Sequence, residues 1–217
     1  QNCSYKEDPS LLTLVYAYPR ISIAIILAVS MTLLSLLLGI LLIHSRKTKE
    51  IRIMSETDAL TGLYNRRAAE DHITRQMQED GRNPGCVRPL ISIDLDKFKQ
   101  VNDTYGHLEG DALLIAVADT LRTSVRSYDI VGRIGGDEFV VYLSNVTDRQ
   151  NAMAVAEKLC QVIRGLSTMK KEWSNISASI GISFADHPDI KMEELYISAD
   201  KAMYSAKGNG RDQYQTL

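Results

Sequence analysis

The chain has 217 residues, a formal net charge of −2 and three cysteines. This near-neutral balance provides no overall basic surface, so we expect no nucleic-acid polymer as a partner. The cysteines show neither the spacing of a zinc site nor a disulfide framework. The roughly 160 residues after the N-terminal apolar stretch suit a single domain with one hydrophobic core.

Residues 21–43 form an unbroken stretch of 23 residues without a charge. At about 1.5 Å rise per residue, a helix of this length crosses a hydrocarbon core of roughly 30 Å. It is longer than the apolar core of a secretory signal, and helices of soluble domains are rarely apolar on every face. The stretch therefore predicts a transmembrane helix.

Four basic residues follow this stretch closely: Arg46, Lys47, Lys49 and Arg52. Before it, two basic residues are balanced by two acidic ones. Because positively charged flanks stay in the cytoplasm, the chain after the helix is predicted to be cytoplasmic. Residues 1–20 would then be an extracytoplasmic stub, and since residue 1 is Gln, we expect a longer N-terminal region that could include a sensor.

Residues 44–57 contain no Pro or Gly and mix charged residues with a few apolar ones. They are predicted to continue the membrane helix as a linker. A rigid linker could transmit rotation or dimer geometry, but the small number of apolar positions suits a solvated spacer equally well.

The rest of the chain opens with a predicted amphipathic helix over 66–79, which ends at the breaker cluster of 80–85. Residues 90–96 are predicted to form a mostly apolar strand. Side chains alternate along a strand, so Asp94 and Asp96 lie on one face at its end. Because Asp96 directly precedes a helical segment, we predict that it caps that helix.

A second helix is predicted over 112–126, where Leu113, Val117 and Leu121 repeat at helical spacing. Two polar residues, Asn102 and Asp111, come before this predicted helix. Asn102 has an ordinary explanation as a turn residue, and Asp111 as an acid favoured by the helix dipole.

Residues 133–143 place Asp137 and Glu138 beside Gly135 and Gly136, between two strand-like segments. The glycines are predicted to take the positive φ angles of a tight hairpin and to let a ligand approach the backbone. Adjacent carboxylates favour a bound cation, although a hairpin with a solvated acidic tip has the same pattern.

The C-terminal part suggests a pair of strands over 173–185 and a last helix over 195–206. Lys207 and Arg211 follow this helix among glycines. The helix dipole and a left-handed glycine cap explain these cations without any function.

Taken together in this order, five segments resemble the GGDEF domain family of diguanylate cyclases, over about residues 55–213. The segments are Asp58–Arg67, Asp94–Asp111, Arg133–Phe139, Ser179–Ser183 and Ala199–Lys207. The resemblance implies an α+β fold for residues 58–217. Its central, mostly antiparallel five-stranded sheet would be flanked by helices, as in nucleotide cyclases and polymerase palms.

The activity implied is the synthesis of cyclic di-GMP from two GTP molecules, with release of pyrophosphate, by a homodimer in a bacterial cell membrane. A catalytically inactive receptor for cyclic di-GMP or GTP is the alternative. A third possibility is a membrane adaptor whose domain only dimerises.

Magnesium, or manganese, is the cofactor implied by the resemblance. Its ligands would be Asp94, the carbonyl of Leu95, Asp137 and Glu138, because hard oxygen ligands suit this ion. Asp137 would be the general base, and Lys99 would neutralise charge developing in the transition state.

The resemblance also implies the binding residues. Asn102 and Asp111 would bind guanine, whose carbonyl and N–H groups an amide and a carboxylate can satisfy together. His107 would lie beside these two residues at the binding site, or it would be a structural histidine with no part in binding. Lys207 and Arg211 would bind phosphate. Gly135 and Gly136 would also belong to the substrate-binding site.

Feedback by the product is implied by the pattern RxxD at Arg126 and Asp129, where the family has an inhibitory site for cyclic di-GMP. An arginine and a carboxylate suit phosphate and guanine recognition. A helix-ending Arg and a strand-opening Asp would show the same pattern.

Overall fold

The computed structural model describes residues 18–83, 85–185 and 189–217. The chain divides into two compact units, with the boundary between Ile53 and Met54. The predicted extracytoplasmic stub lies largely outside the described residues.

The first unit is dominated by helix α2 (Pro19–Glu56), which begins with Pro19, a residue favoured in the first turn of a helix. Its segment Pro19–Leu41 has a mean hydropathy of 2.7 and is long and apolar enough to cross a membrane. The described apolar side chains of this segment are exposed. The backbone stays helical through most of the predicted linker.

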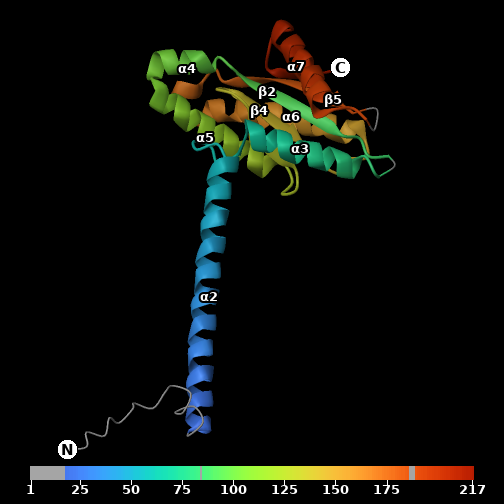
Figure 1. Cartoon of the computed structure of the whole chain (residues 1–217). Helices are drawn as coiled ribbons and strands as arrows, with labels where there is room; N and C mark the ends of the chain where they lie inside the picture. Colours follow the sequence, from blue (N-terminus) through green and yellow to red (C-terminus); the bar gives the residue numbers. More distant parts are fainter. Residues whose placement is uncertain (1–17, 84, 186–188) are drawn as a thin grey trace, which may run out of the picture. The chain divides into compact units, whose positions relative to one another are not determined.

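The second unit alternates strands and helices (Figure 1). Its strands are β1 (Tyr64–Asn65), β2 (Pro89–Asp96), β3 (Ile130–Arg133), β4 (Glu138–Tyr142), β5 (Ser177–Phe184) and β6 (Gln213–Thr216). Its helices are α3 (Arg66–Asp80), α4 (Phe98–Tyr105), α5 (His107–Ser124), α6 (Arg149–Gly165) and α7 (Met192–Gly208), with short 3₁₀ turns η1 (Leu166–Thr168) and η2 (Lys171–Trp173).

The six strands form one sheet in the order β1-β3-β4-β2-β5-β6. The three central pairings are antiparallel, and the outer pairs β1–β3 and β5–β6 are parallel. The mostly antiparallel sheet flanked by helices is confirmed, with one strand more than predicted. The predicted strand pair over 173–185 is wrong, because Trp173 lies in η2 and the neighbours of β5 are β2 and the distant β6.

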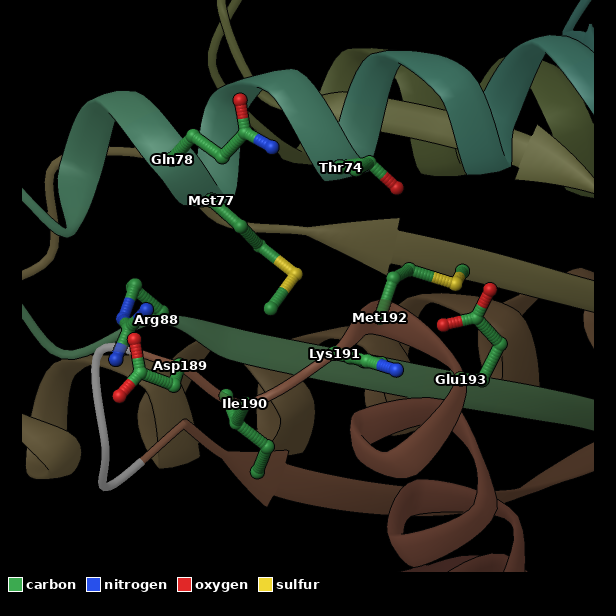
Figure 2. A pocket seen from close by; sticks show the side chains of 9 residues that line it. All are labelled: Thr74, Met77, Gln78, Arg88, Asp189, Ile190, Lys191, Met192 and Glu193. Atoms are coloured by element: carbon green, nitrogen blue, oxygen red, sulfur yellow. The ribbon is translucent and has the colours of Figure 1, made fainter.

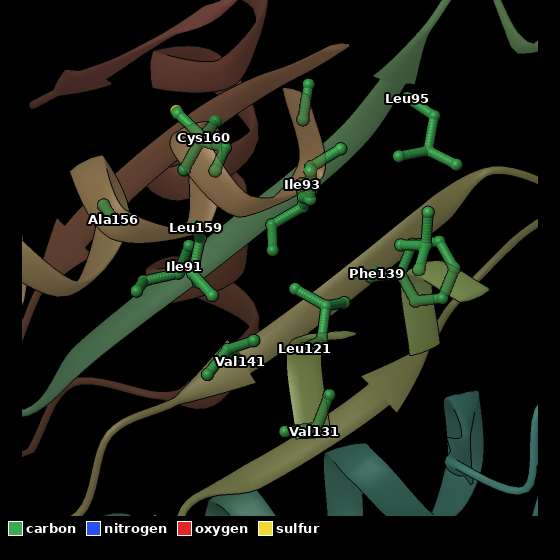
Figure 3. Close-up of a cluster of buried hydrophobic side chains, with 14 of the residues drawn as sticks. Ile91, Ile93, Leu95, Leu121, Val131, Phe139, Val141, Ala156, Leu159 and Cys160 are labelled. Carbon is green, nitrogen blue, oxygen red and sulfur yellow. The ribbon is translucent and has the colours of Figure 1, made fainter. Parts of the chain in front are cut away.

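Helices cover both faces of the sheet, which explains why every residue of β2 is buried. Ile91, Ile93 and Leu95 of β2 join the core formed with α5 and α6, part of which Figure 3 shows. Leu90 faces the opposite way, into the core formed with α3 and α7. The period-two alternation thus directs Asp94, on the same face as Leu90, toward α7.

Helix α7 packs very closely on β5. A Cβ atom at Gly181 would collide with the backbone oxygen of Ala199 and the backbone nitrogen of Met203. Ser183 Oγ donates a hydrogen bond to the carbonyl of Leu195 at 2.7 Å. This contact fixes α7 across the sheet, with its C-terminal end near the end of β2.

Candidate active site

The predicted metal ligands come together where β2 ends and β4 begins. Asp94 and Glu138 are direct cross-strand partners in the antiparallel ladder. One step further, the backbone nitrogen of Leu95 donates to the carbonyl of Asp137 at 3.2 Å. The sheet register therefore places all four residues at one corner of the domain.

The carboxylates of this corner disfavour one another's charge. Burial raises the pKa of Asp94 and of Glu138, and the neighbouring carboxylates raise both further. Lys207 acts in the opposite direction on both groups. A cation would relieve the same repulsion, and the all-oxygen donor set fits Mg²⁺.

The side chains are not gathered around a single point. Within the described ranges, no group of three or more His, Cys, Asp or Glu side chains is arranged to hold a metal ion. Instead, Lys207 Nζ lies 2.6 Å from Asp94 Oδ2. The lysine thus contacts a predicted metal ligand, and the metal set itself stays a prediction.

The two glycines act differently from the prediction. The predicted hairpin is confirmed by the antiparallel pairing of β3 with β4, but neither Gly135 nor Gly136 has a positive φ angle, so that part of the prediction is wrong. The hairpin closes with the backbone nitrogen of Ile134 donating to the carbonyl of Glu138 at 2.9 Å. A Cβ at Gly135 would lie 2.9 Å from Glu138 Oε2, whereas a Cβ at Gly136 would meet open space.

The predicted phosphate-binding cations extend from the end of α7 to the strand end. Lys207 pairs with Asp94, and Arg211 Nε lies 3.7 Å from Asp96 Oδ1. The two acidic residues are two positions apart on β2, and the two cations that meet them are four positions apart, at the end of α7 and in the turn after it.

The predicted cap role of Asp96 is wrong. Helix α4 begins after Lys97, a residue with φ 62°, and has no side-chain cap. The carboxylate of Asp96 instead accepts hydrogen bonds from Ser177 Oγ and Ser179 Oγ at 2.7 and 2.8 Å. These partners lie on β5, about eighty residues away, and nothing in the local pattern indicated them.

The predicted guanine-binding residues lie where α4 meets α5. Gly106, with φ 87°, separates the two helices. The side-chain oxygen of Asn102 occupies the space that a Cβ at Gly110 would need, so Asn102 lies against the residue that precedes Asp111. His107 is exposed at the start of α5, and Lys99 is exposed in α4.

Arg126 and Asp129 form a closed turn rather than two independent elements. Asp129 Oδ2 accepts from the backbone nitrogen of Arg126 at 2.8 Å, and its Oδ1 accepts from that of Ser144 at 3.0 Å. Burial raises the pKa of the Asp129 carboxyl. Both residues line a cavity of about 590 Å³, together with Lys158 of α6.

A second cavity, of about 470 Å³, lies between α3 and the segment that leads into α7 (Figure 2). Figure 2 shows Met77 and Met192 pointing into it from these two elements, with Arg88 at one end. None of the predicted site residues lines this cavity, so it is separate from the candidate site.

The sequence did not predict the interactions that hold the turn at Gly135 and Gly136 in place. Arg133 donates to Asp58 Oδ1 at 3.0 Å and to the carbonyl of Gly136 at 2.8 Å. Burial works against ionisation of Asp58, but hydrogen bonds from Thr61 and Arg133 outweigh it and lower the pKa of the carboxyl. Asp58 and Arg133 both belong to segments that resemble the family, yet only the fold reveals that they meet.

A further missed acid is Asp200, exposed on α7. Burial raises the pKa of Glu138 most, followed by the charges of Asp94 and Asp137. The charge of Asp200 raises it further, by a smaller amount. The motif Ala199–Lys207 contained it, but α7 had to be placed on the sheet before its neighbour was known.

A sheet with helices on both faces, acidic residues at a strand end, and cations at and just after the end of the last helix define a nucleotide-cyclase type of domain. The family described as "Diguanylate cyclase, GGDEF domain" matches residues 55–213. The chain belongs to this family.

Relatives support the assignment. The chain is 37% identical over 206 residues to the bifunctional diguanylate cyclase/cyclic di-GMP phosphodiesterase MucR of Pseudomonas aeruginosa, covering 94% of this chain and 30% of MucR. It is 35% identical over 175 residues to the diguanylate cyclase DgcS of Shewanella oneidensis, covering 80% of this chain and 57% of DgcS. The chain thus spans less than two thirds of either relative.

Solved structures agree with the fold. The coiled coil and GGDEF domain of DgcB from Caulobacter crescentus, crystallised with c-di-GMP, has a TM-score of 0.75 at 24% identity, covering 90% of this chain and all of that one. The GGDEF domain of DgcB, also with c-di-GMP, has a TM-score of 0.67 at 27% identity, covering 74% of this chain and 95% of that one.

Proposed function

We propose that the chain synthesises cyclic di-GMP from two GTP molecules, with Mg²⁺ or Mn²⁺ as cofactor. The observation that carries this proposal is the cross-strand pairing of Asp94 with Glu138, with Lys207 of α7 in contact with Asp94. An acidic pair that needs a cation and a lysine beside it suit the binding of a metal–triphosphate. The names of the relatives MucR and DgcS both include diguanylate cyclase, which supports the same reaction.

Each of two steps would join the 3′-oxygen of one GTP to the α-phosphorus of the other and break the bond to pyrophosphate. The proton of the attacking hydroxyl would pass to Asp137. Bound at Asp94, Leu95, Asp137 and Glu138, the cation would polarise the phosphate and lower the pKa of the hydroxyl. After both steps, one cyclic dinucleotide and two pyrophosphates have formed.

The remaining predicted residues bind and orient the substrate. Asn102 and Asp111 would hold guanine, with His107 beside them. Lys207 and Arg211 would hold the phosphates, and Lys99 would neutralise charge in the transition state. The open space beside Gly136 leaves room for a ligand to approach the backbone.

Two GTP molecules must face each other, so the active form would be a homodimer. Helix α2 is long and apolar enough to cross a membrane, and it runs without interruption to the start of the catalytic unit. We propose a single-pass protein of the bacterial cell membrane with a cytoplasmic catalytic domain. A sensor preceding the helix would control the dimer.

The test is incubation of the full chain in detergent micelles with GTP and Mg²⁺, with nucleotides resolved by chromatography and mass. Cyclic di-GMP from the parent but not from Glu138→Ala is the expected result. If the parent forms none, even when a leucine zipper forces residues 54–217 to dimerise, the cyclase proposal fails. Product binding by such an inactive chain would favour the receptor.

We also propose product inhibition at Arg126 and Asp129, supported by the cavity of about 590 Å³ that both line. Arg126→Ala is the cleaner test, because Asp129 also holds the backbone turn together. We expect added cyclic di-GMP to inhibit the parent and the exposed-surface control Arg82→Ala, but not Arg126→Ala. Equal inhibition of all three would contradict the site.

A further inference from the structure

The carboxylate of Asp96 connects three parts of the chain. Its side chain is nearly inaccessible, at 1% exposure. It accepts hydrogen bonds from the hydroxyls of Ser177 and Ser179 on β5 and, at 3.2 Å, from the backbone nitrogen of Asp212. Arg211 Nε lies 3.7 Å away and supplies the opposite charge.

The chain that Asp96 holds has an unusual conformation. Between α7 and β6, Gly210, Arg211 and Asp212 have φ angles of 112°, 65° and 51° in succession. Residues other than glycine rarely adopt such angles, and they persist only where surrounding contacts fix them. Asp96 holds the backbone of Asp212, while Arg164 Nε holds its carboxylate at 2.9 and 2.7 Å.

This turn carries one of the cations predicted to bind phosphate and follows the other. Asp94 and Asp96 lie on the same face of β2, and Lys207 and Arg211 meet them in the same order. The two pairs differ in access: the Asp94 side chain is 12% exposed, whereas that of Asp96 is almost fully enclosed. Asp94 can therefore reach a ligand, and Asp96 cannot.

We propose that Asp96 is a positioning residue for substrate phosphate. Its carboxylate fixes the turn 210–212 and thereby sets the place and direction of the Arg211 guanidinium. The negative charge matters as well as the hydrogen bonds, because the enclosed carboxylate of Asp96 faces the guanidinium of Arg211, whose side chain is itself exposed. This inference rests on the proposed function, in which GTP is the substrate.

The test compares Asp96→Asn with the parent, using the full chain in detergent micelles. Asparagine has nearly the same shape but lacks the charge. We expect KM for GTP to rise by about tenfold or more with kcat within about threefold, which is the pattern of lost binding. Binding of α,β-methylene GTP, which cannot release pyrophosphate, should weaken by a similar factor.

A double-mutant cycle shows whether Asp96 acts through Arg211. In the Arg211→Ala background, Asp96→Asn should change analogue binding by less than about threefold, because the group that it positions is gone. Equal factors in the two backgrounds would overturn the inference. So would analogue binding by Asp96→Asn within about twofold of the parent.

Asp80→Asn is the matched control for the loss of a buried charge. Asp80 is 1% exposed and accepts a hydrogen bond from Tyr142 Oη at 2.9 Å, apart from the candidate site. It should lower the melting temperature and leave KM for GTP unchanged. An equal rise in KM for Asp80→Asn would indicate general loosening and contradict the positioning role.

Arg164→Ala tests the same turn from the exposed side, in case Asp96→Asn does not fold. It removes the partner of the Asp212 carboxylate and leaves the buried contacts in place, so KM should rise about threefold. Unchanged KM would overturn the role of the turn. If the parent itself binds no analogue, the proposed function fails, whereas binding unaffected by these variants refutes the positioning role alone.

Discussion

Replacing Gly181 by alanine should separate α7 from the sheet. The new Cβ would overlap backbone atoms of Ala199 and Met203, and it would also lie 2.9 Å from Met203 Cα. Backbone atoms of a packed helix cannot rotate away, so we expect the upper end of overpacking costs, about 3 kcal/mol. For a domain of this size, that lowers the melting temperature by about 6–12 °C.

Gly165→Ala is the matched control. Gly165 ends α6 with a helical φ of −56°, and no atom lies within 4 Å of its added Cβ. Alanine should stabilise this position by about 0.5–1 kcal/mol. Thermal unfolding of residues 54–217, followed by circular dichroism, compares both variants with the parent.

The Gly181→Ala variant should also lose cyclase activity, because Lys207 follows α7 away from Asp94. A melting temperature within about 2 °C of the parent would refute the close contact between helix and strand. Normal stability with normal activity would show that α7 does not have to approach the sheet closely.

Three further predictions concern charge and reactivity. Lys207→Met removes a cation beside Asp94, so in the absence of nucleotide it should bind Mn²⁺ at least about tenfold more tightly than the parent. Electron paramagnetic resonance of Mn²⁺ measures this affinity, and an unchanged value would contradict the reasoning. Although burial opposes them, hydrogen bonds from Thr61 and Arg133 lower the pKa of Asp58 in the folded state, so this stabilisation is present above the ordinary pKa of the carboxyl and is lost as the pH falls through its lowered pKa. Acid titration should therefore show a smaller loss of stability for Asp58→Asn than for the parent, and equal losses would argue against this contribution. Burial raises the pKa of Cys160 to about 12, so a thiol reagent at pH 8 should modify partly exposed Cys86 and spare Cys160 until the domain unfolds, while early labelling of Cys160 would contradict its burial.

Local patterns predicted the elements well where one physical signal dominated. Helix α3 begins at Arg66 as predicted, where Asn65 accepts a hydrogen bond from the backbone of Ala68 at 3.0 Å. Helix α5 begins at His107, five residues before the predicted start. Gly106, with its positive φ angle, separates it from α4, and the polar residues on both sides of this glycine are helical.

Predictions failed where a residue answers to distant parts of the chain. Asp96 looked like a cap because a helix follows it, yet its partners come from β5 and from the turn before β6. The two glycines of the β3–β4 hairpin were expected to have positive φ angles, but neither does, and the side chain of Glu138 instead lies close to Gly135.

The sequence by itself determined the apolar N-terminal helix and the family, because hydropathy and motif order are properties of the linear chain. The mostly antiparallel sheet flanked by helices followed only from the resemblance to that family. Only the tertiary structure decided which side chains meet: Asp94 with Lys207, and Asp96 with the strained turn at Arg211. Those contacts depend on strand register and on how closely α7 approaches β5. The first is set by the pairing of β2 with its neighbouring strands and the second by the packing of α7 on β5, and no local pattern contains either.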